Sequence, residues 1–577
     1  MRTFARRALY ARAADTTPAP FVYLALVTAG LGPAALESAR TSFCALQTPA
    51  TVSFAAGREL QGTLAGVAAV EALLIESHVA LPVEHPRPHP TSLEALSSAT
   101  SHALPPWPLA LPWAQSLLAY VSHAEGIRSL EDVHALLDGV DWERALRTLH
   151  AHRGGVDAPS IERAGPSAPA VRFQVQTVRS GSHAFRSVDV SRVVEAAVAA
   201  RFPEWTIERA SSAAGLCDVL MCVALAEDRL LAGLHCHAPD PAPLPTAPQL
   251  LTLKPLRTEP RPWLVHCDRK RLRPSTARLL LELAGLSAPP PAGADAWRVL
   301  DPFGGVGTIA LEAACGFERV HAFSTDRDAA PLSMARANAQ IARGFARAGS
   351  AIDVLPEPCD ARFDLVRQFA PTRTAGQSPG GGRVHRVVSE LPFGTEDGYA
   401  ALTKRDGKQL LLSLSAVLQP DCGKAVLLTF PGLSRALEQA LPEHNARVLA
   451  ARWAGLAASA REDSAQRAAR AAATSAGAAE LASAALWALS SRLTVNIGGL
   501  GGMVTVLEAR QADELAAALD EGGVTTLSPA ELGELRAATE RDVLAAERAL
   551  GAASVALEAA RERAARLKRA LDEVPTV

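Results

Sequence analysis

Two short motifs in this 577-residue chain combine residue types that could bind a small charged ligand and act on it. The first is an acid after an apolar run, followed by a Gly-rich turn and the start of a helix. Glycines let the backbone approach a ligand closely, and a helix N-terminus presents free N–H groups to it. We predict a cofactor-binding turn made of Asp301, Pro302, Phe303, Gly304, Gly305, Gly307 and Thr308.

The second motif reads Glu390-Leu391-Pro392-Phe393-Gly394 and follows about ninety residues later. A carboxylate at Glu390 could accept a hydrogen bond from an exocyclic amino group and orient its nitrogen lone pair. Pro392 stiffens the turn and could aim a carbonyl at the same amine, while Phe393 offers a stacking face for a base. We predict Glu390, Pro392 and Phe393 as catalytic residues. The alternative is a surface turn with a buried Phe.

Two further acids lie downstream: Asp326 follows the next expected strand, and Asp360 is placed in a loop after a third strand. An acid after the second strand can accept ribose hydroxyls, and one after the third can reach an adenine amino group. Each acid alone could equally be a helix cap. Their order after successive strands favours S-adenosylmethionine as the cofactor. Together the two motifs suggest chemistry on an amino group, and we predict no metal site.

Alternating strands and helices from residue 297 onward would position these motifs. This order predicts a mostly parallel sheet covered on both faces, a Rossmann-like α/β domain. Gly-rich residues 372–383 and Ala-rich residues 457–485 are read as insertions. The strands are expected at 298–300, 320–324, 384–389, 424–429, 448–453, and 493–495 with 503–507.

The first 240 residues have a different pattern, which predicts an α+β module. A strand at 21–27 precedes expected helices at 34–40, around 65–75 and within 111–149. Residues 79–112 are rich in Pro, His and Ser and indicate an insertion. A strand at 171–178, a helix at 190–202 and strands at 218–225 and 230–234 follow.

A basic segment at 254–278 connects the two parts of the chain. Such a run is either a solvated face or a strip that contacts phosphates, and the sequence leaves both open. Its basic residues are Lys254, Arg257, Arg261, Arg269, Lys270, Arg271, Arg273 and Arg278.

Bulk composition restricts the function classes. A net charge of −2 excludes a uniformly basic nucleic-acid coat protein. The eight cysteines form no CxxC pair, which argues against a zinc site or a disulfide framework and fits a reducing compartment. No long apolar run predicts a membrane span. We expect a cytoplasmic protein, or a mitochondrial or plastid one if the Arg-rich residues 1–20 are a presequence.

The end of the chain predicts a long amphipathic helix. Ser528, Pro529 and Glu531 form a helix-start signal, and apolar residues then recur in a heptad pattern over 543–574. Such a helix needs a partner surface, in this chain or in another.

Taken in order, these motifs resemble the THUMP-domain RNA methyltransferases, in particular the THUMP domain-containing protein 3 group of tRNA guanine-2-amino methyltransferases. The resemblance covers most of 21–510. It rests on segments 28–32, 171–185 with Asp189 and Val190, 272–277, 301–308 and 495–500, together with the second motif.

The resemblance implies a domain division and partners. It divides the chain into a basic segment (1–20), a ferredoxin-like and THUMP region (21–238, with the THUMP core at 171–238), a linker with a connecting helix (239–296), a methyltransferase domain (297–510) and a helical tail (511–577). It implies binding of the tRNA acceptor stem and 3′ end, and a small zinc-binding Trm-type activator subunit. The implied phosphate contacts are Arg179, His183, Arg186, Lys254, Arg257, Arg269, Lys270, Arg271 and Arg273.

Three positions depart from the family pattern. Glu390 replaces a family Asp, which moves the carboxylate by about 1–1.5 Å, and a shift of about 1 Å can cost ~100-fold in rate. Gly304 and Val306 replace a Cys and a Ser, which are milder changes. The implied function is transfer of a methyl group to the 2-amino group of a tRNA guanosine. The alternatives are the same chemistry on a small nuclear RNA or rRNA, and an RNA-binding protein that has lost catalysis.

Overall fold

The computed structural model describes the two regions that the sequence predicts. The described residues are 21–28, 30–45, 50–54, 70–77, 116–152, 171–180, 182–208, 217–226, 228–236, 261–266, 272–369, 382–393, 402–459, 484–497 and 500–510.

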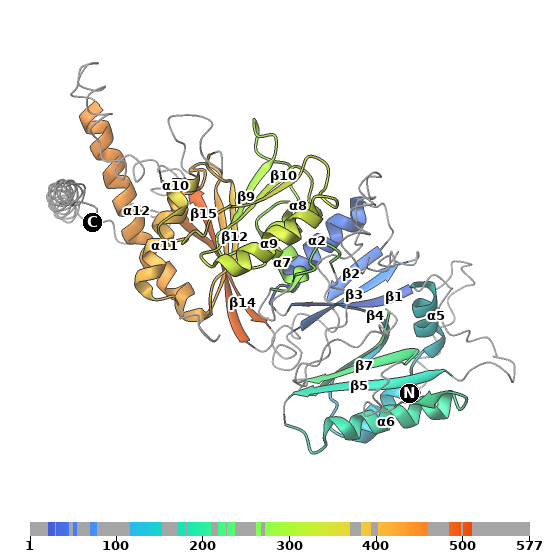
Figure 1. Ribbon diagram of the computed structural model, residues 1–577. Helices are drawn as coiled ribbons and strands as arrows, with labels where there is room; N and C mark the ends of the chain where they lie inside the picture. Colours follow the sequence, from blue (N-terminus) through green and yellow to red (C-terminus); the bar gives the residue numbers. More distant parts are fainter. Residues whose placement is uncertain are drawn as a thin grey trace, which may run out of the picture.

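A seven-stranded sheet forms the second region (Figure 1). Its order is β11-β10-β9-β12-β13-β15-β14, and within it β15 runs antiparallel to β13 and β14 while the other pairs are parallel. The order of the strands along the sequence reverses between the parallel neighbours β9 and β12, as in doubly wound folds. The predicted Rossmann-like α/β fold is therefore confirmed. The strands are β9 (Trp297–Asp301), β10 (Val320–Ser324), β11 (Ala351–Val354), β12 (Arg386–Glu390), β13 (Lys424–Thr429), β14 (Leu486–Ile497) and β15 (Leu500–Arg510).

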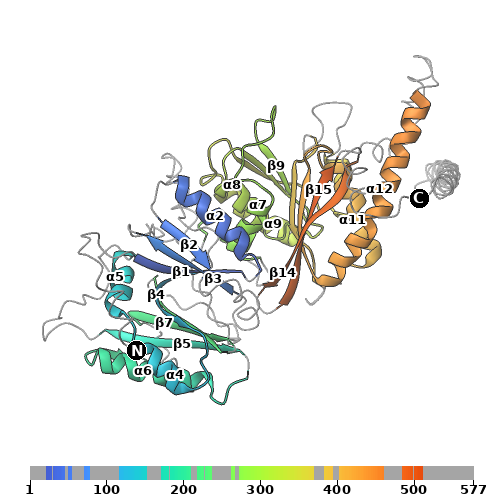
Figure 2. The ribbon, with the colours of Figure 1, turned by 180° about the vertical axis from the view of Figure 1, so that it is seen from behind.

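Helices cover both faces of this sheet. Val299 and Leu300 are neighbours in β9, but Val299 packs in one apolar core and Leu300 in the other. This is because successive side chains of a strand point to opposite faces of the sheet. Val426 and Leu427 of β13 divide in the same way. One face carries α7 (Pro274–Leu283), α8 (Thr308–Gly316) and α9 (Ala329–Ala342), and the other carries α10 (Leu365–Phe369), α11 (Lys404–Val417) and α12 (Pro431–Ser459), whose far end extends away from the body (Figures 1 and 2).

The N-terminal region is built on one eight-stranded sheet, ordered β2-β3-β1-β4-β8-β7-β5-β6. The predicted strand–helix–strand–strand unit is present as β5, α6, β7 and β8, and β4 joins it to the first strands by pairing with both β1 and β8. The α+β prediction is confirmed. The elements are β1 (Phe21–Thr28), α2 (Gly32–Ala45), β2 (Ala50–Phe54), β3 (Val70–Ser77), β4 (Ser116–Ala124), α4 (Leu130–Asp138), α5 (Trp142–His152), β5 (Arg172–Ser180), α6 (Ser187–Arg201), β6 (Thr206–Ile207), β7 (Val219–Ala226) and β8 (Arg229–His235).

Three expectations about secondary structure were wrong. Residues 70–75 belong to β3, which pairs with β1 and β2, and are not helical. Within 111–149, residues 116–124 form β4, and the helices begin only at Leu130. Residues 448–453 lie in α12, where Leu441, Asn445 and Val448 are buried at helical spacing on one face.

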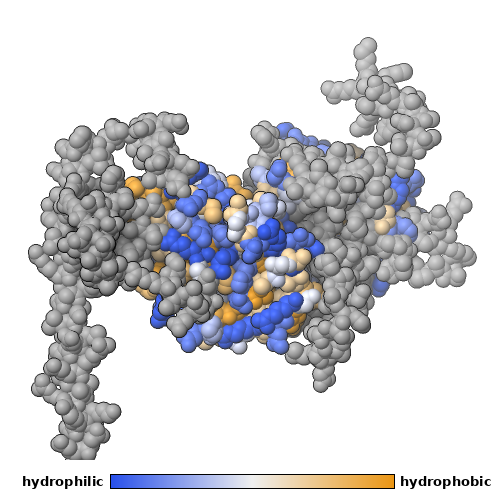
Figure 3. Space-filling model, turned by 90° about the horizontal axis from the view of Figure 1, so that it is seen from above, coloured by the Kyte–Doolittle hydropathy of each residue, from blue (hydrophilic) through white to orange (hydrophobic). Residues whose placement is uncertain are grey.

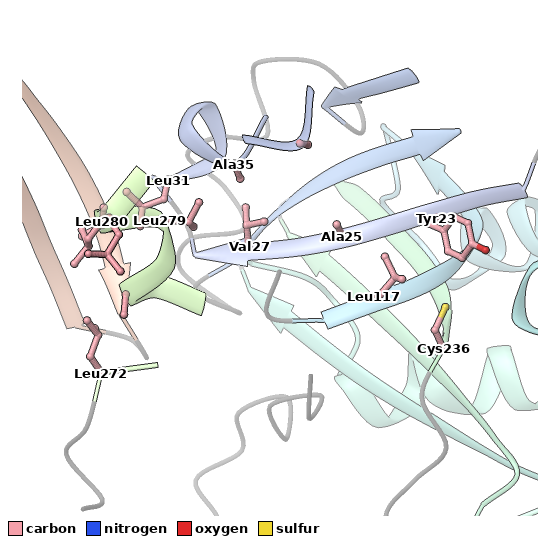
Figure 4. Packing of buried hydrophobic residues seen from close by; sticks show 14 of the residues in the cluster. Tyr23, Ala25, Val27, Leu31, Ala35, Leu117, Cys236, Leu272, Leu279 and Leu280 are labelled. Carbon is pink, nitrogen blue, oxygen red and sulfur yellow. The ribbon is translucent and has the colours of Figure 1, made fainter. Parts of the chain in front are cut away.

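The two regions share one continuous apolar core at their junction, where α2 and α7 lie between the sheets (Figure 2). Leu279 and Leu280 of α7 pack near Val27 and Leu31 (Figure 4). The buried hydroxyls of Thr28 and Thr276 are hydrogen-bonded across the junction at 2.7 Å.

Gly30 lies directly on the backbone of β14. A Cβ at this glycine would be 1.9 Å from the carbonyl oxygen of Thr494 and 2.9 Å from Cα of Val495, and its φ is +89°. The turn after β1 therefore touches the last hairpin of the second region with no space between the two backbones.

Several predicted features lie outside the described residues: segment 1–20, the insertion 79–112, most of the linker, and the tail with its heptads at 543–574. The proposed domain boundaries stay predictions. Among the described helices, none has both the length and the apolar character to cross a membrane. In the view from above, the described residues mix hydrophilic and smaller hydrophobic areas (Figure 3). The exposed large apolar side chains among them include Val188, Val265 and Phe363.

Candidate active site at the carboxyl ends of the strands

The Gly-rich turn connects β9 to α8 in a tight backbone arrangement. The N–H of Gly304 donates to the Thr325 carbonyl at 2.7 Å, and the N–H of Gly307 donates to the Gly304 carbonyl at 2.7 Å. Gly305 and Gly307 have φ values of +53° and +91°, which favour glycine. Gly307 is the N-cap of α8 and carries no side chain that could occupy the first-turn N–H groups. The turn can therefore present these groups to a ligand.

Gly304 lies against the end of β10. A Cβ there would be 2.0 Å from the Ser324 hydroxyl oxygen and 3.1 Å from the Thr325 carbonyl oxygen. This crowding gives a local reason for glycine where the family pattern has Cys. Pro302 and Thr308 are buried beside the turn, and Phe303 packs partly against the core.

Asp301 is buried below the turn. The Ser389 hydroxyl donates to its carboxyl oxygen at 2.6 Å, and the Phe303 N–H donates to the same oxygen at 3.2 Å. Burial raises the pKa of Asp301 to about 7, although both hydrogen bonds oppose the shift. Asp301 therefore connects β9, β12 and the turn, and the structure assigns it a supporting position.

Asp326 follows β10 and is tied to the same turn. Its two carboxyl oxygens accept the N–H groups of Gly305 and Asp328, each at 2.9 Å. Burial raises its pKa, against the effect of these hydrogen bonds. A carboxylate has about four acceptor positions, so two remain for a ligand hydroxyl pair.

Asp360 is held by Arg362, a residue that the sequence reasoning missed. The Arg362 guanidinium donates to both Asp360 oxygens, at 2.9 and 2.6 Å, and to Asp406 at 2.5 Å. The hydrogen bonds from Arg362 lower the pKa of Asp360. The available signal was the Asp-x-Arg spacing itself, because neighbouring opposite charges often pair. Asp360 therefore has fewer acceptor positions left for a ligand than the sequence prediction assumed.

The second motif begins within β12, because Glu390 is the last residue of that strand. The Leu391 N–H donates to the Leu428 carbonyl at 2.8 Å and fixes the start of the turn. Glu390, Pro392 and Phe393 are each partly exposed. The Phe393 ring packs near Gly502, at 3.4 Å from the position that a Cβ on that glycine would take.

The sheet brings these parts to one edge. Strands β10, β9 and β12 are parallel neighbours, so the Gly-rich turn, Asp326 and Glu390 all follow carboxyl ends at the same edge. This edge, at the point where the strand order reverses, is where doubly wound folds bind ligands. The residues fit a cofactor with a ribose and a charged amino-acid part: free helix N–H groups, close backbone approach and an acid beside them.

Three of the predicted RNA contacts, Arg179, His183 and Arg186, lie on the N-terminal module. The Arg179 guanidinium contacts Nδ1 of His183 at 3.0 Å, and because Arg only donates, Nδ1 accepts and the ring proton lies on Nε2. The exposed Arg186 pairs with Asp189 at 3.3 Å. Arg273 is the partly buried N-cap of α7. Lys254, Arg257, Arg269, Lys270 and Arg271 lie outside the described residues.

Two arginines of the basic segment are structural. The Arg261 side chain is 2% exposed and pairs with Glu312 at 2.7 Å. Arg278 pairs with Glu282 at 3.0 Å, donates to the Gly316 carbonyl and stacks on the Phe317 ring at 3.5 Å. The idea of a continuous phosphate-contacting strip over 254–278 is wrong for these two positions, because both guanidinium groups form ion pairs inside the protein.

Comparison with known proteins gives similarity in structure only. No family model and no curated protein matches the chain. TrmN from Thermus thermophilus is similar at 21% identity and a TM-score of 0.45, over 85% of this chain and 100% of that one. A possible methylase from Clostridium difficile 630 is similar at 11% identity and a TM-score of 0.45, over 85% and 99%. A predicted N6-adenine-specific DNA methylase from Listeria monocytogenes is similar at 14% identity and a TM-score of 0.40, over 72% and 91%.

Proposed function

We propose that this protein is an S-adenosylmethionine-dependent methyltransferase that acts on the 2-amino group of a guanosine in tRNA. The observation that carries the proposal is the convergence of the Gly-rich turn, Asp326 and the Glu390–Phe393 motif at one sheet edge. The cofactor would supply an electrophilic methyl group when bound. The chain has only to hold it, orient the amine and exclude water.

Asp326 and the turn would hold the cofactor. Asp326 retains acceptor capacity for ribose hydroxyls, and its bond from Gly305 keeps that carboxylate beside the turn. The first-turn N–H groups of α8 would bind the carboxylate of the amino-acid part. Asp360 would contribute through the acceptor capacity that Arg362 leaves.

Glu390 and Pro392 would orient the guanine amine, and Phe393 would stack on the base. Glu390 accepts a hydrogen bond from the amine, so the nitrogen lone pair points toward the methyl donor. Phe393 packs against the apolar core, which would keep its stacking face in place. No strong base is required, because the amine can lose its proton after transfer.

The N-terminal module would bind the tRNA acceptor stem and 3′ end. Arg179, His183 and Arg186 lie around one turn between β5 and α6, and the Nε2–H of His183 can donate to a phosphate. A small zinc-binding activator subunit, a partner for the heptad segment at 543–574, and a cytoplasmic or organellar location belong to the same proposal.

Methyl transfer to unmodified tRNA transcripts tests the proposal, with and without a small zinc-binding activator subunit, followed by mass spectrometry of the nucleosides. We expect 2-methylguanosine, and a loss of about 100-fold or more for Glu390→Ala with cofactor binding retained. Glu357→Ala, an exposed acid on the loop after β11, is the matched control. Robust activity of Glu390→Ala would refute the assigned role of Glu390.

A second candidate is an RNA-binding protein without catalysis, and the engagement of both Asp360 oxygens by Arg362 favours it. Titration calorimetry with S-adenosylhomocysteine separates the two, because a chain that binds tRNA but not this compound fits only the second candidate. Mass spectrometry of tRNA, rRNA and small nuclear RNA from cells without the protein identifies another RNA target if there is one.

A further inference from the structure

A short segment of the linker, residues 261–266, packs on the helices that flank the Gly-rich turn. The buried Arg261 guanidinium donates to both carboxyl oxygens of Glu312 in α8, at 2.7 and 3.3 Å. The buried Trp263 ring lies 5.6 Å from the Phe345 ring, measured between centroids. The segment is therefore a fixed part of the second region.

One side chain connects this segment to the turn. Asn338 of α9 is fully buried. Its Oδ1 accepts the His266 N–H at 2.8 Å, while its Nδ2 donates to the His266 carbonyl at 2.8 Å and to the Val306 carbonyl at 3.0 Å. Val306 lies between Gly305 and Gly307, the two residues of the turn with positive φ.

We propose that Asn338 is a positioning residue for the cofactor turn, acting as a clamp between residues 261–266 and Val306. The part of this inference that concerns cofactor binding rests on the function proposed above. Asn338 does not itself reach the strand edge where the ligand would lie, and it acts through the Val306 carbonyl.

The physical reason is the freedom of the glycines. Gly residues lose more conformational entropy on ordering than any other type, so a turn with glycines on both sides of Val306 needs external hydrogen bonds to hold its shape. If the turn is not ordered beforehand, ligand binding must supply that ordering and the affinity falls. Losing the clamp is expected to weaken ligand binding about tenfold, which corresponds to about 1.4 kcal/mol.

The chain offers a matched control in Asn445 of α12. Asn445 is also buried, and it makes the same reciprocal pair with one residue's backbone: Nδ2 donates to the Trp487 carbonyl at 2.7 Å and Oδ1 accepts the Trp487 N–H at 2.8 Å. It belongs to the opposite face of the sheet and has no bond to the turn. Asn338→Leu and Asn445→Leu each remove a buried asparagine that is paired with one residue's backbone. The difference is that only Asn338→Leu also removes a hydrogen bond to the turn.

Two measurements on the full-length chain test the clamp. The first is hydrogen exchange at the amides of residues 304–308 without ligand, and the second is calorimetric titration with S-adenosylhomocysteine. We expect Asn338→Leu to speed exchange in the turn at least tenfold and to raise Kd about tenfold, while Asn445→Leu changes each by less than twofold. Equal effects of the two variants, or unchanged exchange in Asn338→Leu, overturn the proposal.

If Asn338→Leu does not fold, Asn338→Ser keeps a small polar side chain that is too short to reach Val306, and the same expectations apply. If the wild-type chain does not bind S-adenosylhomocysteine, the proposed function fails. In that case, faster exchange confined to the turn in the Asn338 variant still supports the clamp, and unchanged exchange still overturns it.

Discussion

Gly30→Ala tests whether the two regions are joined as rigidly as the contact between Gly30 and β14 indicates. The new Cβ would lie 1.9 Å from the Thr494 carbonyl oxygen, and atoms at such a contact normally stay at least 3.4 Å apart. Both sides of the contact are backbone, so the turn or β14 must move by about 1.5 Å. Overpacking of this kind costs about 1–3 kcal/mol.

The positive φ of Gly30 adds a second cost, of about 1 kcal/mol for a residue with a Cβ. Gly126→Ala isolates that part, because Gly126 has φ +77° and no atom within 4 Å of its Cβ position. Urea unfolding should therefore show Gly30→Ala to be less stable than Gly126→Ala by about 1–3 kcal/mol. Limited proteolysis should also cut Gly30→Ala faster near the junction. Equal stability of the two variants would refute the close docking of Gly30 on β14.

Three further predictions follow from single contacts. Burial gives Asp301 a native pKa of about 7, above its unfolded value, so the folded chain binds more protons than the unfolded chain between these values. The free energy of unfolding should therefore fall as pH rises from about 4 to about 7. In denaturation curves recorded over this pH range, Asp301→Asn should flatten the trend. Arg261→Met removes the Arg261 ion pair from the buried Glu312 and should cost about 3–5 kcal/mol by chemical denaturation. Most of this cost should be recovered in Arg261→Met/Glu312→Leu, and a double variant no more stable than the single one would contradict this. Gly502→Val should displace the Phe393 ring and lower methyl transfer while S-adenosylhomocysteine affinity stays within twofold, and an unchanged rate would count against the positioning of Phe393 by β15.

The strands that position the candidate site could be predicted from the sequence because each is a short apolar run between turn signals. The segments 320–324 and 424–429 match β10 and β13. The same rule failed for 116–124 and 448–453, because a fully buried strand and a buried helix turn both appear as apolar runs, and periodicity over so few residues does not separate them. In α12 the helical spacing of Leu441 and Val448 was present but spans a longer window.

The local residues of the site were predicted better than their partners. Asp301, Asp326 and Glu390 were found because an acid after a strand is a local signal. Arg362, Ser324 and Asn338 were not, since each acts on a residue that only the fold brings near: Arg362 on Asp406, Ser324 beside Gly304, and Asn338 on His266 and Val306. Contacts between residues that lie far apart in the sequence have no characteristic spacing along a chain.

The contact between Gly30 and β14 also has a consequence for biosynthesis. The turn after β1 leaves the ribosome well before Thr494 of β14, because the two lie far apart in the sequence. At about 5–20 residues per second, roughly half a minute to a minute and a half separates them. During that time the part of the turn after β1 that meets β14 has no partner, although α7 is made earlier. The junction between the two regions should therefore close fully only after β14 has been made.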